Sequence, residues 1–190
     1  HSHFLNDDHV KVEGESESFV KAYGDHPKAI EVRYLHAKVL MKKNRNSEAL
    51  EQFMKILKNP TALKETEPET WTRLQVRIGV EIGGLMAKQL DFPSAIQIHE
   101  GLLELELEEN DFFEVNYQLG ILNEELKSYQ KALAFYQGII DRVATLKKDN
   151  LSRHLKMIGE MAEWRLKTLN WFEAKESEIQ RKEQEAQFSD

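Results

Sequence analysis

The sequence predicts an all-α protein made of antiparallel helix pairs. Apolar residues recur at every third or fourth position through most of the 190 residues, which is the period of an amphipathic helix. Three of the four prolines, Pro27, Pro68 and Pro93, stand just before such segments, where a missing N–H costs no helical hydrogen bond. No stretch carries a convincing strand pattern, and the 41% hydrophobic content is enough for a buried core.

The elements follow one another in a regular order along the chain. Residues 1–15 are polar and without an apolar period, so we expect a flexible tail there. A partial repeat is expected over residues 16–26, with a short helix from Ser16 to Tyr23 that Gly24 ends. We expect four helix pairs after it, over residues 27–58, 68–109, 111–147 and 151–186.

Two boundaries in this scheme are less obvious. Residues 102–107 alternate leucine and glutamate like a half-buried strand, but they continue an apolar helical pattern from Ala95, and we assign them to that helix. The last pair is expected to comprise one helix over residues 151–167 and a second over 170–186, the second beginning at Asn170.

An internal repeat supports the pairing. Ala49, Ala95 and Ala132 each precede a ring residue by four positions, the rings being those of Phe53, His99 and Tyr136. Small residues stand twelve positions before each alanine and before Ala174, namely Ala37, Gly83, Gly120 and Ala162. A small side chain lets two helices cross closely, and a large ring one turn further fills the neighbouring groove.

These residues resemble the tetratricopeptide repeat family, whose helix pair carries leucine-glycine in its first helix and an alanine followed by an aromatic residue in its second. Leu119-Gly120 with Ala132 and Tyr136 is the best copy. The resemblance covers residues 16–187 and implies a right-handed α-solenoid. The alanines lie 46, 37 and 42 residues apart, against about 34 in the family, so the superhelix is expected to be irregular.

The resemblance also implies a site. First helices line the concave face of such a stack, and partners bind there. The family's groove positions correspond here to eight residues that we predict to contact a partner: Tyr34, Lys38, Arg77, Lys88, Tyr117, Ile121, Glu124 and Lys156. Lys38, Arg77 and Lys88 suit an acidic or carboxylate-bearing peptide, and the alternative for each residue is simple exposure or packing within a hairpin.

The composition of the chain limits the kinds of partner and of site that we expect. A net charge of −7 disfavours nucleic acid and anionic membranes, and no apolar run reaches the length of a membrane span. The absence of cysteine removes disulfides and thiolate metal sites, and it leaves open both the cytoplasm, which we slightly favour, and a bacterial periplasm.

The sequence contains no motif typical of catalysis or of cofactor binding. His99-Glu100 begins like a zinc-protease helix, but Leu103 stands where the second histidine is needed. His1, His3 and His9 lie in the unpatterned tail, and glycines 79, 83 and 84 have no phosphate-loop lysine after them. The sequence therefore predicts no metal, no cofactor and no enzyme activity.

We expect a module that binds a peptide or a partner protein in the concave groove of the superhelix. Two alternatives stay open at this point. One is a structural subunit that assembles with itself through the broken repeat near Phe19 or the helix after Trp171. The other is a regulatory domain that binds a small ligand between its helices.

Overall fold

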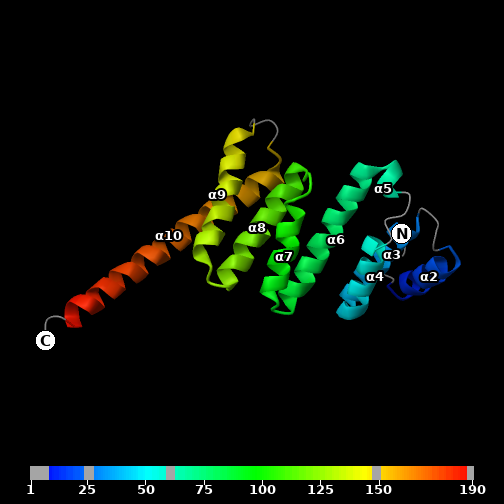
Figure 1. Ribbon diagram of the computed structural model, residues 1–190, viewed down its shortest axis with the longest axis horizontal. Helices are drawn as coiled ribbons and strands as arrows, with labels where there is room; N and C mark the ends of the chain where they lie inside the picture. Colours follow the sequence, from blue (N-terminus) through cyan, green and yellow to red (C-terminus); the bar gives the residue numbers. More distant parts are fainter. Residues whose placement is uncertain (1–8, 24–27, 59–62, 147–150, 188–190) are drawn as a thin grey trace. The chain divides into compact units, whose positions relative to one another are not determined.

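The computed structural model describes residues 9–23, 28–58, 63–146 and 151–187. All regular structure in these ranges is α-helical, which confirms the predicted all-α class (Figure 1). The chain divides into two compact units, residues 1–89 and 90–190. The helices of the first unit are α2 (His9–Ala22), α3 (Ala29–Lys42), α4 (Asn46–Lys58), α5 (Leu63–Thr66) and α6 (Pro68–Lys88). Those of the second are α7 (Phe92–Leu102), α8 (Glu109–Glu125), α9 (Tyr129–Thr145) and α10 (Arg153–Gln187).

The first unit is organised around the hairpin of α3 and α4. Asn44 adopts φ 60° in the short turn between the two helices, a left-handed conformation that asparagine accepts more readily than most residues. Ala37 of α3 and Ala49 and Phe53 of α4 are fully buried. Helix α2 packs on α3, and α6 packs on α4. The helices expected within residues 27–58 are therefore present, while Pro27 lies outside the described residues.

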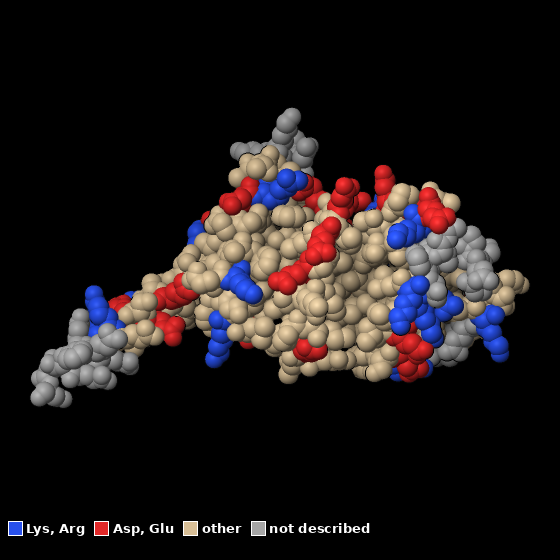
Figure 2. Space-filling model, in the orientation of Figure 1, with Lys and Arg blue, Asp and Glu red and all other residues tan. Residues whose placement is uncertain are grey.

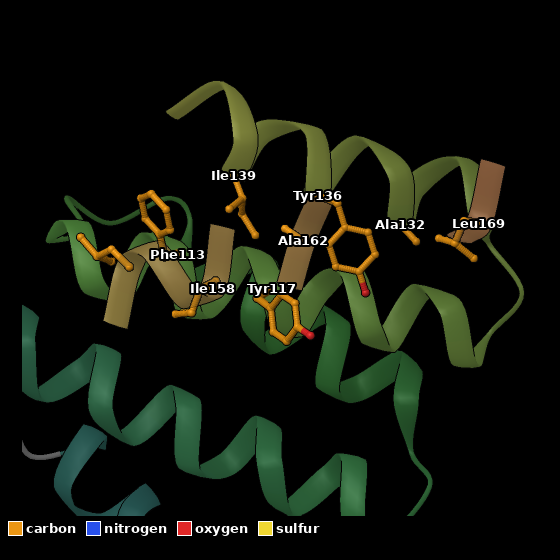
Figure 3. Close-up of a cluster of buried hydrophobic side chains, with 9 residues drawn as sticks. Phe113, Tyr117, Ala132, Tyr136, Ile139, Ile158, Ala162 and Leu169 are labelled. Carbon is orange, nitrogen blue, oxygen red and sulfur yellow. The ribbon is translucent and has the colours of Figure 1, made fainter. Parts of the chain in front are cut away.

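The second unit repeats this hairpin in α8 and α9. Lys127, with φ 56°, turns the chain between them, and a bidentate hydrogen bond from Arg142, near the end of α9, reaches Glu109 at the start of α8. Helix α10 packs on both α8 and α9. The core between them contains Phe113, Tyr117, Ala132, Tyr136, Ile139, Leu155, Ile158, Ala162 and Leu169 (Figure 3).

The two hairpins place equivalent rings in equivalent positions. Tyr34 of α3 lies 5.8 Å from Phe53 of α4, measured between ring centroids, with an interplanar angle of 52°. Tyr117 of α8 lies 5.8 Å from Tyr136 of α9 at 55°. In each hairpin the first ring stands three residues before the small residue, and the second stands four residues after the buried alanine. The repeat seen in the sequence is thus a repeat of packing geometry in these two hairpins.

Gly120 shows why the first helix needs a small residue. A Cβ atom built on Gly120 would lie 2.4 Å from Cε1 and 2.6 Å from Cζ of Tyr136, both inside the distance of any normal contact. The Tyr136 ring therefore lies directly against the backbone of α8. The close helix crossing that we inferred from the sequence is present at this position.

The amino-terminal tail was predicted to be too long. Helix α2 begins at His9, so residues 9–15 are helical rather than part of a flexible tail. The expected helix from residue 16 is present within α2, and its Phe19 and Tyr23 rings contact each other at 5.4 Å. Residues 1–8 lie outside the described part of the chain.

The expected second pair, residues 68–109, is divided between the two units, with α6 in the first and α7 in the second. Both helices begin as predicted, with proline in their first turn, and Asp91 caps α7 by accepting a hydrogen bond from the Ser94 amide at 3.2 Å. Helix α7 nevertheless ends at Leu102, so the helical assignment of residues 103–107 was wrong. The leucines of this segment, Leu103, Leu105 and Leu107, are half-buried, while the glutamates between them are exposed. The alternation of leucine and glutamate was therefore a sign of a non-helical segment.

The predicted last pair is also wrong in its second half. Helix α10 runs without interruption from Arg153 to Gln187, through the expected break at residues 168–169. The segment Thr168-Leu169-Asn170 contains neither glycine nor proline, so the helical hydrogen bonds continue across it. Ala162 and Ala174 consequently lie on one helix and cannot pack on each other. Ala162 is buried and Ala174 is exposed.

The Gly120–Tyr136 contact predicts opposite effects for two glycine substitutions in the same hairpin. Gly120→Ala should lower the free energy of unfolding by about 1–3 kcal/mol, because its methyl group overlaps the Tyr136 ring. Gly138→Ala, in α9 with no atom near the added Cβ, should raise it by about 0.5–1 kcal/mol through helix propensity. Chemical denaturation of both variants measures the change in the free energy of unfolding. Equal changes in the two variants would contradict the contact between Gly120 and the Tyr136 ring.

Candidate functional site

Three of the predicted groove residues meet in the first unit. The Tyr34 hydroxyl of α3 donates to Oε1 of Glu81 in α6 at 3.3 Å, and the Lys38 ammonium forms a salt bridge with the same carboxylate. The Arg77 guanidinium lies over the Tyr34 ring, 4.5 Å from its centroid. These three predicted residues therefore lie together, and Glu81, which was not among the predicted residues, lies between them.

Glu81 changes what these residues can do. Its carboxylate satisfies the charge of Lys38, so this lysine is not held ready for a ligand's carboxylate. Burial raises the pKa of Tyr34, the charge of Glu81 raises it further, and Arg77 opposes both effects. The tyrosine is therefore a neutral donor in a compact polar cluster that joins α3 to α6. Lys88 stands apart from this cluster, exposed in the last turn of α6.

A second polar cluster joins the three helices of the second unit. Arg165 of α10 donates through Nη1 to both carboxylate oxygens of Glu124 in α8, each at 3.0 Å. Its Nε atom lies 3.4 Å from the Tyr117 hydroxyl, and the Tyr136 hydroxyl of α9 donates to Glu124. Figure 3 shows the two tyrosine rings between these helices. Arg165 was not among the predicted residues, whereas Tyr117 and Glu124 were.

The charges in this second cluster depend on one another. Burial raises the pKa of Tyr136 far above its usual value, and the hydrogen bond to Glu124 raises it further. Burial disfavours the charge on Arg165, but Tyr117, Tyr136 and Glu124 outweigh this effect and raise its pKa. Arg165 and Glu124 are therefore a fixed ion pair, with side chains 31% and 20% exposed, at the point where α8, α9 and α10 meet.

An open groove begins beside this ion pair. It has a volume of about 980 Å³ and lies between the carboxyl end of α8, the start of α9 and the outer half of α10. Its apolar lining includes Trp171, Phe172 and Ile179, which are 57%, 58% and 56% exposed. We refer to this feature as the α10 groove, and its remaining lining residues are Glu124, Glu125, Lys127, Tyr129, Leu169, Glu173, Lys175, Glu176 and Gln180.

Two predicted residues of the second unit, Ile121 and Lys156, belong neither to the polar cluster nor to the α10 groove. Ile121 packs against the core of α8, α9 and α10 rather than lining the α10 groove. Lys156 is exposed on α10, where its Nζ atom lies 4.0 Å from Glu160 and its side chain borders a smaller groove against α9. The eight predicted residues thus supply two tyrosine-centred clusters, one core residue and two separate surface lysines.

The aromatic residues of α10 were not predicted as site residues. The expected fold-back at Asn170 placed residues 170–186 in the second helix of a pair, whereas the predicted groove residues belong to first helices. A usable signal was present on the exposed face of α10, because Met157, Met161, Trp164, Thr168 and Trp171 recur at spacings of four and three.

His99 is a core residue of α7. It is buried in α7, its Nδ1 atom lies 2.8 Å from the Ala95 carbonyl oxygen, and burial lowers its pKa. Across the ranges that the structure describes, no three side chains of the metal-binding types converge on one point. No helix among those described is both long enough and apolar enough to span a bilayer.

No protein-family model matches the sequence, and no curated protein is similar enough to it to count as a relative. The geometry of the two clusters and of the α10 groove therefore carries the functional argument.

The Tyr136–Glu124 hydrogen bond predicts a specific alkaline response. Tyr136→Phe should lower the free energy of unfolding by about 1.5–3 kcal/mol at neutral pH, since a hydrogen bond to a charged group is lost. The folded-state pKa of Tyr136 is raised above the unfolded value, so its stabilising effect is complete below about pH 10 and is lost as the pH rises further. The difference between wild type and variant should shrink above pH 10, by up to about 1.4 kcal/mol per pH unit.

Urea denaturation of both proteins at a series of pH values up to about 11 measures this difference. Two stability curves that stay parallel across the alkaline range would contradict the proposed environment of Tyr136.

Proposed function

We propose that this chain is a protein-binding module of the tetratricopeptide-like kind, and that it holds a segment of another protein in the α10 groove. The observation that carries the proposal is the exposed group of Trp171, Phe172 and Ile179 beside a groove of about 980 Å³. Apolar side chains of this size are normally buried, and a contiguous exposed group marks an interaction surface. Tryptophan and other aromatic residues are enriched at the energetic centres of interfaces.

The packing of the helices supports the finer fold in this proposal. In the second unit, α10 lies against both members of the α8–α9 hairpin, as the first helix of a following repeat does in a solenoid. In the first unit, α6 packs on the second helix of the α3–α4 hairpin. The matching ring pairs in the two hairpins favour one repeated unit. A right-handed superhelix of such pairs is the arrangement that we propose.

The polar rim indicates what kind of segment the α10 groove prefers. Four carboxylates border the groove, those of Glu124, Glu125, Glu173 and Glu176, against two lysines, Lys127 and Lys175. Arg165 neutralises Glu124, and Glu173 accepts a hydrogen bond from Gln130 at 2.8 Å. Lys175 pairs with Glu178 at 2.7 Å, so the charges left at the rim are those of Glu125, Glu173 and Glu176 against that of Lys127. A segment with apolar anchors and neighbouring lysine or arginine residues therefore fits better than an acidic one.

This preference differs from the acidic peptide expected for Lys38, Arg77 and Lys88. Glu81 already pairs with Lys38, and Arg77 lies over Tyr34. An incoming carboxylate would have to displace Glu81 from Lys38 before using that charge. The first-unit cluster is accordingly proposed as a structural tie between α3 and α6.

Peptide selection tests the proposed function. Random peptides displayed on phage and selected on the immobilised chain should converge on aromatic or aliphatic anchors with basic neighbours. Phe172→Ser combined with Ile179→Ser should weaken binding of a selected peptide at least about tenfold, because two groove anchors are truncated. Both side chains are more than half exposed, so the melting temperature should stay close to that of wild type.

Met54→Ser is the matched control, since Met54 is an exposed apolar residue of α4 in the other unit. It should leave peptide binding unchanged. Failure to select any peptide would refute the proposal, and so would equal affinity of the groove variant and the control.

A further inference from the structure

Helix α10 carries a second apolar stripe on a different face from its core contacts. Five residues form it, and we refer to them as the α10 seam: Met157, Met161, Trp164, Thr168 and Trp171. Met157, Met161 and Trp164 are 50%, 40% and 64% exposed. The core face of the same helix instead presents the buried residues Leu155, Ile158, Ala162 and Leu169. A helix with two separate apolar faces has one available for another partner.

The spacing of the seam indicates what shape of partner it fits. Its members are separated by four, three, four and three residues, which is the heptad spacing by which one helix packs along another. If residues 170–186 folded back as a separate helix, they could cover this stripe. Helix α10 runs straight on to Gln187 instead, and the seam keeps its exposed methionines and tryptophans.

We infer that the α10 seam packs antiparallel against the α10 seam of a second copy of this chain, forming a two-fold dimer. A two-fold interface brings one surface against itself, so the surface must complement itself in both shape and charge. The seam has large residues on either side of small Thr168, which lets bulky side chains of one copy lie beside smaller ones of the other.

The charges beside the seam favour the antiparallel direction. Glu160 and Lys167 flank the same edge of the seam, seven residues apart. In an antiparallel pair this edge meets itself, so Glu160 of one copy faces Lys167 of the other, and the contact occurs twice. In a parallel pair the same edge would meet the edge that holds Arg165, whose charge already pairs with Glu124.

The present partners of Glu160 and Lys167 do not prevent this. Lys156 lies 4.0 Å from Glu160, and Glu163 lies 2.6 Å from Lys167, in exposed pairs within the helix. Such pairs contribute little and exchange readily. Figure 2 shows both acidic and basic side chains on the face of α10 that is in view.

The exposed apolar area of the α10 seam is comparable to the apolar part of a standard protein–protein interface. Aromatic side chains present roughly 150–250 Å² each, so Trp164 and Trp171 offer roughly 100–150 Å² apiece at their observed exposure. With the two methionines the seam offers roughly 400 Å² of apolar surface. A standard interface buries about 800 Å² per partner, of which somewhat more than half is apolar. The seam supplies most of the apolar part of such an interface.

The dimer goes beyond the proposed peptide binding and can fail separately from it. Of the five seam residues, only Trp171 also lines the α10 groove. Met161 and Trp164 belong to the seam alone, so their substitution tests self-association and leaves the groove anchors Phe172 and Ile179 in place.

Sedimentation equilibrium over about 1–100 µM protein tests the dimer, a range that covers the micromolar affinity expected of an interface of this size. Wild type should change from the monomer mass of 22.2 kDa to twice that value as concentration rises. Met161→Glu combined with Trp164→Glu should stay monomeric and keep the wild-type melting temperature. Met54→Glu, which places the same charge on an exposed methionine of α4, should dimerise like wild type.

A charge exchange tests the direction of packing. Glu160→Lys alone and Lys167→Glu alone should each weaken the dimer about tenfold, because each creates like-charge contacts at two symmetric places. The double variant should recover the wild-type affinity, which a parallel pair would not allow. A wild-type chain that stays monomeric up to 100 µM would overturn the inference, and so would a double variant as weak as the single ones.

Discussion

The contact between the Gly120 backbone and the Tyr136 ring governs the second unit. Because α8 has no side chain at this point, the ring of α9 can lie against its backbone, and the two helices approach closely. The same approach carries the Tyr136 hydroxyl to Glu124, and Arg165 of α10 then pairs with that carboxylate. One close helix crossing thereby fixes the hairpin, the ion pair and the position of the third helix.

In the first unit, the crossing of α3 and α4 is formed by different residues. Ala37 and Phe53 replace the glycine and tyrosine, and the ring pair keeps the same centroid distance. Phe53 has no hydroxyl, so the polar link to the next helix comes from Tyr34 and Lys38 through Glu81. The repeat therefore conserves the shape of the helix crossing while the polar residues that tie neighbouring helices together vary.

Helix α10 both contributes to the core of the second unit and exposes large apolar side chains at its surface. Its first half completes the core of the second unit with one face and exposes Met157, Met161 and Trp164 on another. These exposed residues belong to the α10 seam, whereas Phe172 and Ile179 of the second half line the α10 groove, and Trp171 belongs to both. A continuous helix leaves the seam and the groove exposed together, which a helix folded back at Asn170 could not, because its second half would lie against its first.

The sequence by itself determined the helical class, most helix starts and the small-residue and ring positions of the two hairpins, because these depend on local period, capping and side-chain size. The family resemblance selected Tyr34, Lys38, Arg77, Tyr117 and Glu124 as groove positions, and the structure places them in two polar clusters. Only the tertiary structure revealed the partners Glu81 and Arg165, since each lies more than forty residues from the groups that it joins. The tertiary structure also decided that α10 continues past Asn170. Asparagine suits a helix start, but a helix interior tolerates it too when the residues around it are good helix formers.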